Sequence, residues 1–146
     1  MIGLLQRVSH ATLRINGEEY SRIGSGLLVF VGIEKDDNEA RADRLLQRLL
    51  AYRVFGDDEG RMNRSLRDVG GELMLVSQFT LAASTDKGLR PGFSLAMPPE
   101  EAEPLYDYMV SKALAEPGIA VATGCFGADM KIALENDGPV TFLLKG

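Results

Sequence analysis

Runs of apolar residues and two-residue alternation predict strands in the first quarter of the chain. Residues 1–8 and residues 11–15 each fit a strand, and residues 18–23 fit a third. Asn16-Gly17 separates the last two; because both residues tolerate positive φ, this pair predicts a β-hairpin. Residues 26–33 are almost continuously apolar, which predicts a strand buried on both faces.

Helical spacing of apolar residues begins after this strand. The sequence Asp36-Asp37-Asn38-Glu39 opens the helix, and Asp36 followed three residues later by Glu39 resembles a capping box. Asp37 and Asn38 are alternative caps. The helix is expected to end near Tyr52. Its apolar face follows the i, i+3, i+4, i+7 rule with Ala42, Leu45, Leu46 and Leu49.

A second helix is predicted from Pro99 to about Ala115, and Pro117-Gly118 ends it. Pro104 lies inside this segment and predicts either a kink or a later helix start. The predicted apolar face consists of Ala102, Leu105, Tyr106, Met109 and Ala113.

The remaining segments complete a mixed order of elements, strand-strand-strand-helix-strand-helix-strand-strand. This order favours a single α+β domain over residues 1–146, with a largely antiparallel sheet or open barrel and two main helices. The segments are a polar loop with short structured pieces (55–67), a strand (72–81), an irregular segment (85–98), a short strand (119–123) and two final strands (130–134 and 140–144).

Composition narrows the class of protein. The chain has 146 residues, 45% hydrophobic content and a formal net charge of −5, which fits one globular domain and argues against a broad basic face for duplex DNA. No apolar run is long enough to cross a bilayer, and the N-terminus does not fit a signal peptide. We therefore expect a cytoplasmic protein without a membrane partner.

The usual catalytic side chains are scarce. His10 is the only histidine and Cys125 the only cysteine, so no disulfide and no Ser-His-Asp triad is expected. Ligands at zinc-like spacing are absent, and we expect no metal and no cofactor. An enzyme of this sequence would have to act through backbone amides, hydroxyls or groups of the substrate.

Two polar stretches could supply such groups. Ser77-Gln78-Phe79-Thr80-Leu81 ends an apolar strand, where backbone N–H groups can point at an oxyanion. The Thr80 hydroxyl is a candidate nucleophile or hydrogen-bond donor, although no base stands beside it in the sequence. The alternative is that Ser77 and Thr80 are ordinary strand residues.

The second stretch is Asn136-Asp137-Gly138-Pro139, between the two final strands. It fits a plain turn. A Gly-Pro bond can also be cis, and a cis proline in a folded protein is usually a deliberate feature that turns the chain sharply. The pattern alone leaves both interpretations open.

Together these motifs resemble the D-aminoacyl-tRNA deacylase family over essentially the whole chain. The two signature stretches are Ser77-Gln78-Phe79-Thr80-Leu81 and Asn136-Asp137-Gly138-Pro139-Val140-Thr141-Phe142. Further matching stretches are Leu5-Gln6-Arg7-Val8, Gly26-Leu27-Leu28-Val29, Gly32-Ile33-Glu34-Lys35-Asp36-Asp37, Tyr52-Arg53-Val54-Phe55, Met62-Asn63, Arg90-Pro91-Gly92-Phe93-Ser94 and Leu105-Tyr106-Asp107-Tyr108.

The resemblance implies a cytoplasmic homodimer that hydrolyses the ester between a D-amino acid and the terminal adenosine of tRNA. It also implies action on glycine carried by the wrong tRNA, tRNA(Ala). Gly138-Pro139 would be a cis pair that reaches into the partner subunit's pocket and rejects L-amino acids, which is specificity by exclusion. Arg7 would hold this pair in place.

The resemblance further implies a catalytic set of Ser77, Gln78, Phe79 and Thr80. Amides near Phe79 and Thr80 would stabilise the oxyanion, and the ribose 2′-hydroxyl would help to activate water. Lys87 and Arg90 are candidate contacts to the tRNA acceptor end. Three other classes compete with this interpretation: a non-catalytic RNA-binding module, a small-molecule esterase, and a structural dimer in which the Gly-Pro pair is only a corner.

Overall fold

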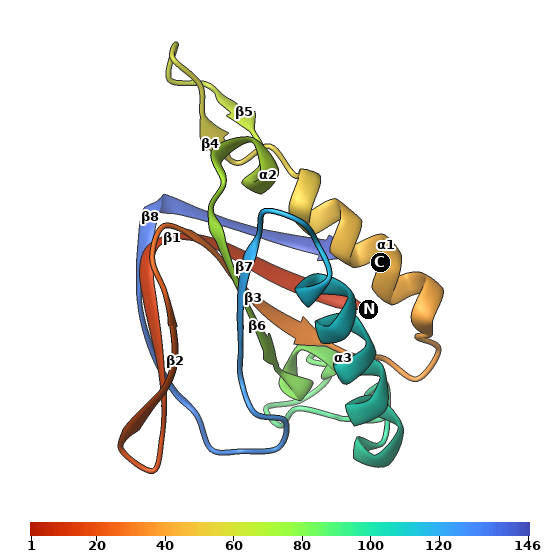
Figure 1. The fold of residues 1–146 in the computed structure, drawn as a ribbon. Coiled ribbons are helices and arrows are strands. Elements are labelled where there is room, and N and C mark those ends of the chain that lie inside the picture. Colours follow the sequence, from red (N-terminus) through yellow and green to blue (C-terminus); the bar gives the residue numbers. More distant parts are fainter.

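A computed structural model describes residues 1–146 as a six-stranded mixed sheet with helices against one of its faces, and a separate two-stranded sheet (Figure 1). The α+β class with two main helices is confirmed. The strands are β1 (Ile2–Ile15), β2 (Glu18–Ile23), β3 (Gly26–Gly32), β4 (Phe55–Gly56), β5 (Met62–Arg64), β6 (Glu72–Ser77), β7 (Ala120–Thr123) and β8 (Lys131–Lys145). The helices are α1 (Glu39–Ala51), α2 (Leu66–Val69), α3 (Pro99–Leu114) and the 3-10 helix η1 (Phe79–Ala82).

The sheet has the order β2-β1-β3-β6-β7, and β8 pairs along β1. Pairing is antiparallel around β1 and parallel from β3 through β6 to β7. Strongly bent β1 and β8 curl the sheet into a nearly closed barrel. A hydrogen bond from Ser21 Oγ to the Thr123 carbonyl, at 2.8 Å, links β2 to the far strand β7. The Asn16-Gly17 hairpin is confirmed, with φ of 52° and 81° at these residues.

Strand β3 lies at the centre of the core. Leu27, Val29 and Val31 face the core cluster under α1 and α3, whereas Leu28 belongs to a second cluster on the other face of the sheet. The predicted burial of this strand on both faces is therefore confirmed. The predicted apolar faces of both helices are also buried, at Ala42, Leu45, Leu46, Leu49, Ala102, Leu105, Tyr106, Met109 and Ala113.

The helix starts differ in detail from the sequence expectations. Helix α1 is capped by Asn38, whose side chain accepts a hydrogen bond from the Arg41 N–H at 3.1 Å. The capping box headed by Asp36 is therefore wrong. Asp37 instead accepts a bond from the Glu34 N–H at 2.7 Å and is buried. Helix α3 begins at Pro99 and continues through Pro104, so the later start is wrong.

Strand β6 ends at Ser77, four residues before the predicted end. The Gln78 N–H makes a 2.8 Å bond to the Val31 carbonyl, and β3 itself ends at Gly32. The chain then turns into η1, which packs across Gly32: a Cβ on that glycine would lie 2.7 Å from the Cβ of Leu81. Without a longer strand beside it, the segment 78–81 has no ladder to join.

The two predicted final strands are one bent strand, β8, which pairs with one continuous strand, β1 (Figure 1). The partners are Gln6 with Thr141 on one side of the bend and His10 with Glu135 on the other. Between these pairs β1 advances four residues and β8 six, so β8 contains two extra residues. Gly138-Pro139 lies in this bulge, and its peptide bond is cis. The plain turn is therefore wrong, because pairing with β1 continues on both sides.

Candidate active site

An open cleft of about 590 Å³ lies where the parallel strands β3 and β6 end. Its lining is mostly apolar and comes from four places in the chain. These are the ends of β3 and β6 (Val31, Ile33, Val76, Ser77, Gln78 and Phe79), the segment before and into α3 (Phe93, Ala96, Met97, Pro98, Pro99 and Ala102), the loop after β7 (Phe126, Gly127, Ala128, Asp129 and Met130) and Ile132 of β8.

Three of the four predicted catalytic residues line this cleft: Ser77, Gln78 and Phe79. Phe79 and Thr80 are the first residues of η1, so their N–H groups have no acceptor within that helix. Thr80 itself does not line the cleft. Its Oγ1 accepts a hydrogen bond from Gln78 Nε2 at 2.6 Å. The cleft therefore has backbone donors at the end of β6, and the Thr80 hydroxyl is bonded to its neighbour.

The cleft contains one charged side chain, Asp129. This carboxylate is exposed and forms an ion pair with Lys131 at 2.7 Å. Groups with a shifted pKa lie elsewhere: burial raises the pKa of Tyr106 in the core, and hydrogen bonds from Arg67 and Gln47 lower the pKa of Glu116. His10 and Cys125 are outside the lining as well. No three His, Cys, Asp or Glu side chains are grouped so that they could hold a metal ion.

The segment from Asn136 to Val140 is tied to Arg7. Arg7 Nε donates to the Asp137 carbonyl at 3.0 Å, and Nη1 donates to the Val54 carbonyl at 2.6 Å. In return, Asn136 Nδ2 donates to the Arg7 carbonyl and to the Val140 carbonyl, both at 2.9 Å. The Arg7 side chain is only 16% exposed, whereas Gly138 and Pro139 are exposed. Arg7 thus holds the base of a loop whose tip faces outward.

The two signature stretches lie apart within one chain. Arg7 is opposite Leu27 in the β1–β3 pairing, and Ser77 is opposite Val31 in the β3–β6 pairing. These positions are four residues apart along β3, about 13 Å at 3.3 Å per residue. Neither Gly138 nor Pro139 lines the cleft. A role for the Gly-Pro pair at a cleft therefore requires the cleft of another copy.

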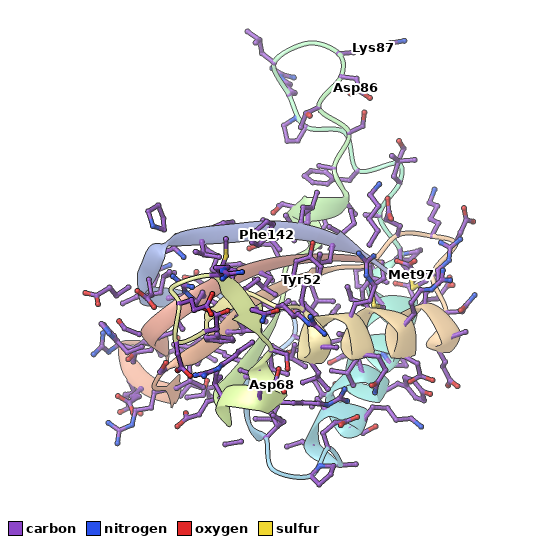
Figure 2. The ribbon with its side chains drawn as sticks, turned by 90° about the horizontal axis from the view of Figure 1, so that it is seen from above. Tyr52, Asp68, Asp86, Lys87, Met97 and Phe142 are labelled. Carbon is purple, nitrogen blue, oxygen red and sulfur yellow. The ribbon has the colours of Figure 1, made fainter.

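Lys87 and Arg90 lie on a hairpin that projects beside the cleft. A pair of backbone hydrogen bonds between Ser84 and Gly92, at 2.7 and 2.9 Å, closes it. Figure 2 shows the hairpin standing away from the body, with Asp86 and Lys87 at its tip. Lys87 and Arg90 are both exposed. Phe93 and Met97 also line the cleft, although neither was predicted to do so. The only signal in the sequence was that both are apolar residues within the irregular segment 85–98.

The sequence pattern that defines the family described as D-Tyr-tRNA(Tyr) deacylase matches residues 4–145. The chain belongs to this family. The predicted family is therefore confirmed over nearly the full length.

Relatives named D-aminoacyl-tRNA deacylase align over almost their whole length. The protein from Stutzerimonas stutzeri (strain A1501) is 59% identical and that from Cronobacter sakazakii (strain ATCC BAA-894) 54% identical, each over 99% of both chains. Among solved structures, the c-Myc DNA Unwinding Element Binding Protein has a TM-score of 0.94 at 36% identity, covering 100% of this chain and 99% of its own.

A second solved structure, of a probable eukaryotic D-amino acid tRNA deacylase, shows the same fold. It has a TM-score of 0.80 at 20% identity and covers 98% of this chain and 97% of its own. This likeness concerns the fold alone. No helix of the chain is long and apolar enough to span a membrane.

Proposed function

We propose that the cleft at the end of β6 hydrolyses the ester of D-aminoacyl-tRNA, releasing the free D-amino acid and tRNA. Its family makes the chain an aminoacyl-tRNA deacylase, a carboxylic ester hydrolase. The observation that carries the assignment of the site is the position of Phe79 and Thr80. Their N–H groups begin η1 at the edge of the cleft, where they can donate to the oxyanion of a tetrahedral intermediate.

Water is the proposed nucleophile. The cleft has no histidine, lysine or glutamate, and Asp129 is engaged by Lys131. The 2′-hydroxyl of the terminal ribose lies next to the ester and can help to orient and activate water. Thr80 ranks second as a nucleophile, because its hydroxyl is bonded to Gln78 and lies outside the lining. In this mechanism Ser77 and Gln78 shape the wall beside the ester.

Discrimination between D- and L-amino acids is assigned to Gly138-Pro139 of a second copy. In one chain this pair is exposed and does not line the cleft, which supports a homodimer in which each loop enters the partner's cleft. Its carbonyls would occupy the space that an L side chain needs, while a D side chain points elsewhere. Glycine has no side chain to exclude, so glycyl-tRNA(Ala) is a substrate as well.

Binding is confined to the acceptor end of tRNA. A chain with a net charge of −5 makes few phosphate contacts, so its affinity is modest and falls with salt. Lys87 and Arg90 on the projecting hairpin are the proposed contacts, and the reaction takes place in the cytoplasm.

The decisive test is the deacylation of one tRNA charged with D-tyrosine or L-tyrosine, with glycyl-tRNA(Ala) as a third substrate. The proposal expects rapid loss of the D-ester and of glycine, with the L-ester spared. Loss of both tyrosyl esters would support ester hydrolysis but contradict the rejection of L-amino acids by Gly138-Pro139. If no ester is lost, the chain would be better explained as an RNA-binding module. Binding of duplex DNA, measured at several salt concentrations, would test whether this chain has the DNA binding that gives the 36% identical protein its name.

A further inference from the structure

We propose that Tyr106 is a positioning residue for hydrolysis of the ester. Its hydroxyl fixes two walls of the cleft relative to each other, the end of β6 and the loop that follows β7. This inference rests on the proposed function, because it concerns the reaction in the same cleft. Tyr106 does not line the cleft, so it acts through the backbone that it binds and does not touch the substrate.

The cleft begins at a fork, the point where the parallel strands β6 and β7 part. Their pairing extends as far as Leu75 with Thr123. After this pair, the Gly124 N–H donates to the Leu75 carbonyl at 2.9 Å. β6 then continues to Ser77, while the other segment turns away into the loop after β7, and both segments line the cleft. The width of the cleft therefore depends on how the two segments are held at the fork.

Tyr106 lies at this fork. Its hydroxyl donates to the Leu75 carbonyl at 2.8 Å, so this carbonyl accepts bonds from Tyr106 and from Gly124. Tyr106 is only 3% exposed, and leaving a buried polar group without a partner is costly, which favours this one position of the hydroxyl. Its ring packs on that of Phe126, a lining residue, with centroids 6.0 Å apart. One side chain therefore joins β6 to the loop after β7.

Helix α3, which contains Tyr106, forms a further part of the wall. Ala102 lies four residues before Tyr106, on the same face of the helix, and it lines the cleft together with Pro98 and Pro99. Three segments that border the cleft thus meet at Tyr106: the start of α3, the end of β6 and the loop after β7.

The end of β6 has a neighbouring strand on one side only. On that side the Gln78 N–H donates to the Val31 carbonyl of β3 at 2.8 Å. On the side of β7 the pairing stops at Leu75, four residues before Phe79. The N–H groups of Phe79 and Thr80 are the proposed oxyanion donors, so a shift of the strand end moves them relative to the ester. A misplacement of about 1 Å can lower a rate by about 10²-fold.

The role of Tyr106 does not involve the transfer of its proton. Burial raises the pKa of Tyr106, so the hydroxyl keeps its proton and its bond to the Leu75 carbonyl at neutral and moderately alkaline pH. Removal of the hydroxyl should therefore lower the rate without changing the shape of its pH dependence.

The first experiment compares Tyr106→Phe with Tyr108→Phe in the deacylation of D-tyrosyl-tRNA. Tyr108 is the matched control, because it lies on the same helix and its hydroxyl bonds the Asp43 carboxylate of α1 at 3.1 Å, away from the fork. We expect kcat of Tyr106→Phe to fall about tenfold and KM to change less than about twofold, because every lining side chain is kept. Tyr108→Phe should keep the kcat of wild type.

The assay is run at pH 6 to 10, at a temperature where circular dichroism shows each variant to be folded. Parallel pH profiles for wild type and Tyr106→Phe would support positioning. The loss of one limb of the profile in Tyr106→Phe would indicate proton transfer by Tyr106 and overturn the proposal. A kcat of Tyr106→Phe within about twofold of wild type, or an equal fall in Tyr108→Phe, would overturn it as well.

The second experiment examines the fork without catalysis, by amide hydrogen exchange measured with NMR. In Tyr106→Phe the Gly124 N–H should exchange about 2- to 12-fold faster, because its acceptor carbonyl has lost the second donor that held it. The Glu72 N–H is the control, since it bonds the Ser25 carbonyl at the other end of β6 and should exchange as in wild type. Equal acceleration of both amides would mean a general loss of stability and would contradict a local role.

The two experiments distinguish the failure of each proposal. If wild type hydrolyses no aminoacyl ester, the proposed function is wrong and so is the role of Tyr106 in it, even where the exchange of Gly124 shows that the hydroxyl fixes the fork. If wild type hydrolyses D-tyrosyl-tRNA and Tyr106→Phe does so with the same kcat, the deacylase is supported and the positioning role is wrong.

Discussion

The guanidinium of Arg7 lies directly against the α-carbon of Gly138. A Cβ on Gly138 would come within 3.1 Å of Arg7 Nη2 and within 2.7 Å of Val140 Cγ2. Gly138 also has a φ of +136°, where side chains are strained. Arg7 and Gly138 are therefore packed tightly together. The guanidinium of Arg7 binds the backbone of the loop, and it fits there because Gly138 has no side chain.

Gly138→Ala should displace this loop and weaken the rejection of L-amino acids. The strained φ alone costs about 1–3 kcal/mol, and the contacts with Arg7 and Val140 add to it. We expect the rate on L-tyrosyl-tRNA to rise at least about tenfold relative to the rate on D-tyrosyl-tRNA, a change of about 1.4 kcal/mol in relative barrier. Gly60→Ala is the matched control, with a φ of +77° and no atom near its Cβ. If the loop is displaced in Gly138→Ala but the ratio of the rates on D- and L-tyrosyl-tRNA is unchanged, the loop does not reject L-amino acids.

Arg7→Lys should lower both stability and selectivity. Lysine keeps the charge but cannot replace the separate bonds from Nε to the Asp137 carbonyl and from Nη1 to the Val54 carbonyl. Losing hydrogen bonds to a charged group costs about 1.5–3 kcal/mol, which corresponds to a fall in Tm of about 4–12 °C. Differential scanning calorimetry and the D/L rate ratio measure the two effects. Arg14→Lys, exposed on the same strand, should change neither.

Thr80→Val tests the identity of the nucleophile. If water attacks the ester, the variant loses only the acceptor of the 2.6 Å bond from Gln78, and turnover of D-tyrosyl-tRNA should stay within about tenfold of wild type. Thr85→Val, in the exposed hairpin, is the control for a lost threonine hydroxyl. Mass spectrometry after rapid quenching of the wild-type reaction tests the alternative. An acyl group trapped on Thr80 would contradict attack by water and establish covalent catalysis.

Tyr106→Phe should lower stability at neutral pH, and this effect should become smaller at alkaline pH. The Tyr106 hydroxyl is buried and donates to the Leu75 carbonyl at 2.8 Å, and burial raises its pKa above the usual value of 10. The folded state keeps this proton while the unfolded state releases it, so wild type loses stability as pH rises above 10. At neutral pH we expect the variant to be less stable by about 0.5–1.5 kcal/mol.

Urea unfolding at pH 8, 10 and 11 measures the pH effect. The difference between wild type and Tyr106→Phe should shrink as pH rises above 10, because the variant has no proton to lose at this position. Tyr20→Phe is the control, since Tyr20 is half exposed at the surface. A difference that stays constant across the series would contradict the proposed linkage.

The sequence predicts the elements whose signals are local. The Asn16-Gly17 hairpin, the apolar faces of α1 and α3 and the doubly buried β3 depend on spacing along one segment, and the structure contains all of them. Element ends that depend on a distant partner were misjudged. The predicted strand continues to Leu81, but β6 stops at Ser77 because β3 ends beside it.

The candidate site was likewise predicted only in its local features. The sequence reveals the two signature stretches and the change from apolar to polar residues at Ser77. It does not reveal that the two stretches lie apart in space, because this depends on Arg7 and Ser77 lying opposite different parts of β3. Phe93 and Met97 were missed because no regular pattern marks the segment 85–98. That segment reaches the cleft through backbone bonds to the end of β3, such as Met97 N–H to the Ile33 carbonyl at 3.1 Å.

The two extra residues of β8 affect which insertions and deletions the fold can accept during evolution. An even number preserves the inward and outward alternation of side chains on both sides of the bulge. A deletion of two residues from 137–140 would therefore let β1 and β8 close into an unbroken ladder with the same core. The segment 137–140 can therefore change in length by two residues while the pairing of β1 with β8 and the core of the barrel stay the same.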